Sequence, residues 1–122
     1  MARVVHFEIT ADDPERAVRF YEKALGWKIH RMEGGIACWL VTTGEEGQMG
    51  IDGAIMDRSD PAQAVINTIG VGDLEATMEA VRNAGGKADG DIDDIPTVGR
   101  FTYATDTEGN RFGILEPLPR GW

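Results

Sequence analysis

The stretch HFEITADDPERAVRFYEKALG, at residues 6–26, decides the fold of this chain, because NTIGVGDLEATMEAVRNAGG at residues 67–86 follows the same order. Shifting the sequence by sixty positions places Asp13 on Asp73. Each stretch is typical of a strand, an aspartate that caps a helix, an amphipathic helix and a glycine that ends it. The repeat therefore predicts two similar modules.

Strand alternation predicts which side chains of the first strand face the helix. Phe7 and Ile9 are expected to lie beneath it, so His6 and Glu8 are expected on the opposite face of the sheet. The buried stripe of the first helix is predicted to consist of its periodic apolar residues, which are Ala17, Phe20, Tyr21, Ala24 and Leu25. Further strands are predicted at residues 27–31, 36–43, 49–56, 65–71, 101–105 and 111–116, with a stub at 87–89 and an acidic loop over 90–100.

This order predicts an α+β fold of two βαβββ modules, with one helix per module and curled mixed sheets around a shared cleft. The 122 residues suit one domain. We expect the first module at about residues 1–56, a polar linker at 57–64, the second module at about 65–117 and a tail at 118–122.

Composition narrows the classes of partner. A net charge of −9 argues against nucleic acid and anionic membrane surfaces, and it is compatible with a cationic ligand. No apolar run approaches the ~20 residues of a membrane span. The single cysteine, Cys38, cannot form an internal disulfide, and the N-terminus enters a strand pattern at once. We therefore expect a cytoplasmic protein.

Several motifs together resemble the vicinal-oxygen-chelate superfamily, which includes glyoxalase I, extradiol dioxygenases, fosfomycin-modifying enzymes and bleomycin-binding proteins. The residues that carry the resemblance are His6, Asp13, Phe20-Tyr21 followed by Leu25-Gly26-Trp27, and Asp106-Thr107-Glu108-Gly109-Asn110 before the last strand. The resemblance covers nearly the whole chain. It implies paired βαβββ modules, in agreement with the repeat.

In metal-dependent members of that superfamily, four strand positions supply His, Gln or Glu ligands. The resemblance places these positions on His6, on Asn67, near Gly53 and on Gly113. Of these, only His6 is a good donor, so we expect no metal cofactor. The alternative is one divalent metal ion held by His6 and Glu116. Glu116 lies three residues after Gly113, and this odd spacing predicts that its side chain points to the opposite face.

The remaining candidates would line a polar pocket. If Thr105 pairs with Arg111, Tyr103 lies opposite Gly113, and its ring could occupy the space of a missing metal ligand. The expected ligand-binding residues are His6, Glu8, Trp39, Asn67, Tyr103 and Arg111. Each also has a structural interpretation: His6 and Glu8 could form an internal pair, and Trp39 could be a core aromatic.

Three functions stay open at this point. The first is metal-free binding of a small organic molecule by sequestration, in the manner of bleomycin-binding relatives. The acidic composition is compatible with a cationic ligand of that kind. The second is a metal-dependent lyase, isomerase or dioxygenase. The third is a metal-free enzyme in which His6 and Glu8, the two candidate catalytic residues, transfer a proton. The resemblance also implies a homodimer.

Overall fold

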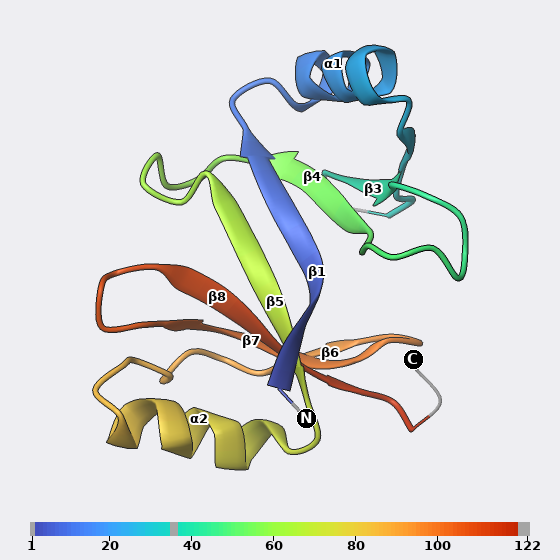
Figure 1. The fold of residues 1–122 in the computed structure, drawn as a ribbon. Helices are drawn as coiled ribbons and strands as arrows, with labels where there is room; N and C mark the ends of the chain where they lie inside the picture. Colours follow the sequence, from blue (N-terminus) through green and yellow to red (C-terminus); the bar gives the residue numbers. More distant parts are fainter. Residues whose placement is uncertain (1, 35–36, 120–122) are drawn as a thin grey trace. The chain divides into compact units, whose positions relative to one another are not determined.

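The computed structural model describes residues 2–34 and 37–119, and these divide into two compact units. The first unit is His6–Ile66, and the second comprises the described residues of Met1–Val5 and Asn67–Trp122. Each unit holds one helix and a mixed four-stranded sheet (Figure 1). The predicted α+β class, with one helix per module, is confirmed.

The first unit follows the order strand, helix and three strands. Its elements are β1 (Ala2–Ala11), of which the residues from His6 onward belong to this unit, α1 (Pro14–Leu25), β2 (Lys28–Arg31), β3 (Cys38–Thr42) and β4 (Gly53–Asp57). The strands lie in the order β2-β3-β4-β1, in which β1 and β4 are parallel and the other pairs are antiparallel.

The second unit repeats this arrangement. Its elements are β5 (Val65–Val71), α2 (Leu74–Asn83), β6 (Asp93–Ile95), β7 (Gly99–Thr105) and β8 (Arg111–Pro117). The strands lie in the order β5-β8-β7-β6, with β5 and β8 parallel. No helix within the described residues is long and apolar enough to cross a membrane.

Both helices begin where the sequence predicts. The side chains of Asp13 and Asp73 accept hydrogen bonds from the backbone N–H groups of Arg16 (3.1 Å) and Ala76 (3.0 Å). These bonds satisfy amides that have no partner inside the helix. Gly26 ends α1 in the left-handed conformation, with φ of 72°.

One face of each sheet packs against the helix of its own unit. In the first unit, Phe7 and Ile9 pack against a core that includes Val41 and Ile55, as the alternation predicts. In the second unit, Leu74 and Met78 of α2 pack in the same cluster as Ala104 and Ile114, together with Val71 and Ala88. The opposite face of each sheet is therefore free of its helix.

Several predicted boundaries are wrong. Residues 49–52 are not a strand: β4 begins at Gly53, and Met49 is fully exposed. The acidic loop contains a short strand, β6, while the predicted stub at 87–89 is a single bridge from Lys87 to Thr105. Ile36, at the start of a predicted strand, and residues 120–122 of the predicted tail lie outside the described residues.

The buried stripe of α1 is narrower than predicted. Ala17 and Tyr21 pack against the core, but Phe20 is 60% exposed and Leu25 is 55% exposed. Helical periodicity identifies an apolar side of the helix without giving the width that the sheet covers.

Candidate functional site

His6 and Glu8 lie on the face of the first sheet that α1 does not cover. Glu8 pairs with Ala54 in β4, and Leu40 pairs with the same alanine, so these side chains share a face. Glu8 is only 7% exposed. A carboxylate is therefore buried among strand residues that are mostly apolar.

The surroundings of this face shift two ionisation equilibria. Burial lowers the pKa of His6, against a weaker upward effect of the Asp52 carboxylate. The imidazole is therefore neutral at neutral pH, with one nitrogen available as an acceptor. Burial and the nearby Glu8 carboxylate both raise the pKa of Cys38, so this buried thiol stays protonated.

The last strand of the first unit, β4, turns Gly53 toward α1 rather than toward the face that carries Glu8. Gly53 pairs with Phe7, and a Cβ atom on Gly53 would lie 2.5 Å from the Phe7 ring, so Gly53 faces the helix side. Ala54 takes the position opposite Glu8. Asp52 lies before the strand, where its carboxylate accepts hydrogen bonds from the backbone N–H and hydroxyl of Thr43 (2.9 and 3.2 Å).

Trp39 lies on the other face of the first sheet from His6. It pairs with Ile55, packs against the core beneath α1 and has the Arg31 guanidinium 5.3 Å from its ring centroid. The interpretation of Trp39 as a core aromatic agrees with this placement.

In the second unit, the predicted hairpin register is confirmed. Thr105 pairs with Arg111 and Tyr103 pairs with Gly113. The Arg111 guanidinium lies 5.7 Å from the Tyr103 ring centroid, which is a cation–π geometry. Tyr103 and Arg111 therefore share one face of the second sheet.

The ring that fills the space at Gly113 belongs to Phe101 rather than to Tyr103. A Cβ atom on Gly113 would lie 2.6 Å from the Phe101 ring and 3.0 Å from the Thr68 hydroxyl oxygen. Phe101 also meets Tyr103 edge to face, with centroids 4.9 Å apart. The sequence offered no signal for Phe101, because ring placement on a strand depends on rotamers as well as on register.

Thr68 is a further residue that sequence reasoning missed. It pairs with Gly113, is 2% exposed, and its hydroxyl has no hydrogen-bond partner within the described part of the chain. The repeat contained the signal, since a shift of sixty positions places Glu8 on Thr68.

Asn67 lies on the helix side of its sheet. It pairs with Phe112 and alternates in phase with Ile69, and both of these side chains pack against the α2 core. His6 lies seven residues before Asp13, and the residue seven before Asp73 is Ile66, not Asn67. The structure therefore separates Asn67 from the face of β5 that carries Ile66 and Thr68.

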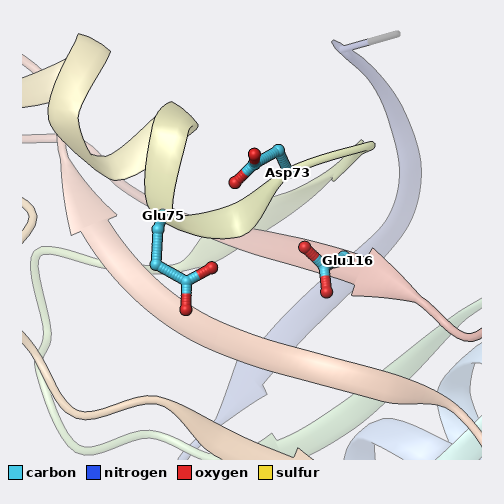
Figure 2. Close-up of side chains that lie close together, drawn as sticks. All are labelled: Asp73, Glu75 and Glu116. Carbon is cyan, nitrogen blue, oxygen red and sulfur yellow. The ribbon is translucent and has the colours of Figure 1, made fainter.

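Glu116 also faces the helix side, as its odd spacing from Gly113 predicts. One of its oxygens accepts a hydrogen bond from the backbone N–H of Leu74 (2.9 Å), and the other pairs with Arg100 at 3.3 Å. Figure 2 shows Glu116 with Asp73 and Glu75, whose ligand atoms lie within 4.8 Å of one another.

Arg100 already engages two members of this acidic cluster. Its guanidinium binds Glu75 through both terminal nitrogens and binds Glu116 through one of them. The hydrogen bond from Arg100 is the main reason that the pKa of Glu75 is lowered. The cluster therefore acts as an ion-pair network that joins β7 and β8 to the start of α2.

The comparisons with known proteins agree on one family. The Glyoxalase/Bleomycin resistance protein/Dioxygenase superfamily matches residues 3–114. A glyoxylase-like domain-containing protein of Didymella fabae is 36% identical over 112 residues, which is 88% of each chain. A protein of Mycobacterium bovis that carries the name of a glyoxylase, CFP32, is 29% identical over 123 residues; the match covers 93% of this chain but 43% of the relative.

Solved structures show the same fold at low sequence identity. Methylmalonyl-CoA epimerase from Mycobacterium tuberculosis has a TM-score of 0.69 at 19% identity, covering 96% of this chain and 89% of the epimerase. A Streptomyces coelicolor methylmalonyl-CoA epimerase, solved in complex with 2-nitronate-propionyl-CoA, has a TM-score of 0.71 at 16% identity, covering 98% and 96%. The extent of the superfamily match, together with the 36% identical relative, shows that this chain belongs to the Glyoxalase/Bleomycin resistance protein/Dioxygenase superfamily.

Proposed function

We propose that this protein binds a small organic molecule without a metal ion, on the face of the first unit that carries His6 and Glu8, and acts by sequestering it. The observation that carries the proposal is the shortage of metal donors at the four positions where metal-dependent relatives hold ligands. His6 is one donor, and the Asp52 carboxylate next to the position near Gly53 already accepts two hydrogen bonds from Thr43.

The register supports this conclusion more strongly than the sequence does. Ala54 and Gly113 stand opposite Glu8 and Thr68, and Ile66 stands where the repeat places the counterpart of His6. The Phe101 ring lies in the direction that a side chain at Gly113 would take. A catalytic zinc site needs about three protein ligands and one open position, and this donor set does not fit one.

The same face suits an organic ligand. A neutral imidazole, a buried carboxylate and apolar neighbours such as Leu40 and Ala54 offer an acceptor, a negative charge and hydrophobic contact. A cationic ligand would gain from Glu8 and from the overall charge of −9. Tyr103 and Arg111 form a separate candidate surface in the second unit. Homodimer formation and a cytoplasmic location are part of the same proposal.

Ligand titration tests the binding function. We expect bleomycin or ethidium, both cationic, to change the tryptophan fluorescence saturably, and benzoate to do so less. Glu8→Gln should weaken binding of the cation by about tenfold or more, since a buried charge pair is lost. The matched control is Glu79→Gln, which removes the same charge from an exposed position on α2. No saturable response to either cation, or equal losses in both variants, would contradict the proposal.

A second candidate function is proton transfer with Glu8 as the base. The observation that favours it is the burial of the Glu8 carboxylate on the same face of β1 as His6, which places two groups able to carry a proton together and away from bulk water. If Glu8 transfers a proton, Glu8→Gln abolishes exchange of an acidic C–H proton of a bound thioester with solvent deuterium and leaves its affinity intact. If Glu8→Gln loses both the affinity and the exchange, Glu8 has a role in binding alone.

The metal-dependent alternative has a direct test. Elemental analysis of the purified protein should show less than about 0.1 equivalent of zinc, iron or nickel, given the weak donor set. One equivalent of metal that is lost in His6→Ala would overturn the metal-free proposal.

A further inference from the structure

The first unit has a concave region on the side that carries α1, away from His6 and Glu8. A cavity of about 530 Å³ opens between the end of β1, the first turns of α1 and the segment at residues 58–65. Its walls include Ile9 of β1 and Tyr21 of α1, which both pack against the core between the sheet and the helix. The volume falls within the range of roughly 300–1,000 Å³ that small-molecule pockets occupy.

The floor of this cavity is held in place by hydrogen bonds. Arg58 donates to the Thr10 hydroxyl (3.0 Å) and to the Thr10 carbonyl (2.9 Å), and it pairs with Asp12 at 3.4 Å. The Thr10 hydroxyl in turn donates to the carbonyl of Gln63 (2.9 Å), and the backbone N–H of Thr10 bonds to Ala64. The segment after β4 is thereby fixed to the end of β1, so the cavity is largely preformed.

The rim of the cavity exposes two large apolar side chains. Phe20 is 60% exposed and Val65 is 59% exposed, and both line the cavity. Apolar groups of this size that surround a concave surface indicate a binding site more often than isolated exposed residues do. A role in lining the cavity also explains why position 20 is aromatic, although most of the Phe20 side chain is not buried in the core.

The charges around the cavity leave one cation available. Asp12 pairs with Arg58, and Asp13 accepts the backbone N–H of Arg16. The Arg16 guanidinium has no hydrogen bond or ion pair with the rest of the described chain. Arg16 and Phe20 are four residues apart on α1, so the guanidinium and the ring are neighbours on one side of the helix.

We propose that this cavity is a second small-molecule site for an amphipathic carboxylate. The carboxylate pairs with Arg16, and the aryl or alkyl portion contacts Phe20, Val65 and Ile9. A guanidinium binds a carboxylate through two parallel hydrogen bonds, which gives both affinity and orientation. The site is independent of the function proposed for the His6 face.

Isothermal titration with two matched probes tests the site. The probes are 1-naphthaleneacetate and 1-naphthaleneacetamide, which share the ring system and differ in charge. We expect the acid to bind with one-to-one stoichiometry and the amide to bind about tenfold more weakly. Arg16→Gln should reduce the affinity for the acid to that for the amide. Phe20→Ser should weaken both.

Three controls keep the test specific. Arg19→Gln removes the same charge from an exposed position on α1 that does not line the cavity, and it should leave the affinity unchanged. His6→Ala and Glu8→Gln should also have no effect, so failure of this site is distinguishable from failure of the proposed function. Sedimentation of Phe20→Ser should match that of the unaltered protein.

The proposal is overturned by any of three results. The first is no saturable heat with the acid at millimolar concentration. The second is an equal loss of affinity in Arg16→Gln and Arg19→Gln. The third is a change of association state in Phe20→Ser together with no binding, which would make this surface an interface between copies of the chain.

Discussion

The two helices of this protein start with the same aspartate cap, and they differ in the residue that follows it. In α1 that residue is Pro14, which has no backbone N–H. In α2 it is Leu74, whose N–H donates to Glu116. The difference between proline and leucine at this position thus adds a backbone N–H that a residue of the last strand must accept. This structural role explains the Glu116 carboxylate, which otherwise resembles a metal ligand.

The largest effect that the comparison predicts concerns the glycines of the two last strands. In Gly53→Ala the new Cβ would lie 2.5 Å from the carbonyl oxygen of Phe7, and backbone cannot move aside cheaply. In Gly113→Ala the nearest atoms are those of the Phe101 ring, which can rotate. We expect a loss of about 3 kcal/mol or more at position 53 and about 1–2 kcal/mol at position 113. Urea denaturation measures both, and equal losses would show that the two strands tolerate a methyl group alike.

A smaller loss is expected in Glu116→Gln. The amide cannot pair with Arg100, and it is a weaker acceptor for the Leu74 N–H, so the free energy of unfolding should fall by about 1–2 kcal/mol. Its counterpart in the first unit is Asp57, which is exposed. The helix of that unit begins with Pro14, so no backbone N–H there needs a carboxylate from the last strand. Asp57→Asn should change stability by less than about 0.5 kcal/mol. A comparable loss there would contradict the assigned role of Glu116.

Thr68→Val should stabilise the protein by about 1 kcal/mol, because it removes a buried hydroxyl that has no partner and keeps the shape of the side chain. Thr102 provides the matched control, since it is equally buried but donates to the Asp91 carbonyl at 2.8 Å. Thr102→Val should be destabilising by a similar amount. If both changes were destabilising, the Thr68 hydroxyl would have a partner in solution.

The smallest expected effect is the pH dependence that His6 contributes. Its folded-state pKa lies below the ordinary value of 6.5, so between these two values the unfolded chain binds more protons. The free energy of unfolding should therefore rise with pH across this window, and His6→Gln should flatten that rise. His30, which is exposed, gives the control variant His30→Gln. Urea denaturation between about pH 5 and pH 8 checks the slopes, and an unchanged slope in His6→Gln would exclude this contribution.

The sequence predicted the features that short-range chemistry determines. Aspartate caps, the helix ends and the pairing of Tyr103 with Gly113 depend on residues close together in the chain, and all are found. The polar hairpin turn and the alternation after it were sufficient to set that register.

Register between distant strands was less predictable. A slip of one residue moves every side chain to the other face, and the glycine-containing stretch at 44–53 conceals the start of β4. The resemblance pointed near Gly53, and the register places Ala54 opposite Glu8. It pointed to Asn67, whereas Ile66 has the same interval to its cap aspartate as His6 has to Asp13. That interval, read in both repeats, is the sequence signal for Ile66.

The buried, protonated thiol of Cys38 allows the opening of the first unit to be followed by chemical labelling. The chain has one cysteine, and it belongs to the first unit. Alkylation by a maleimide can proceed only when that unit opens, so the labelling rate under native conditions reports its opening free energy alone. Comparing this rate with amide hydrogen exchange in β8 would reveal whether the repeats open separately or as one cooperative body.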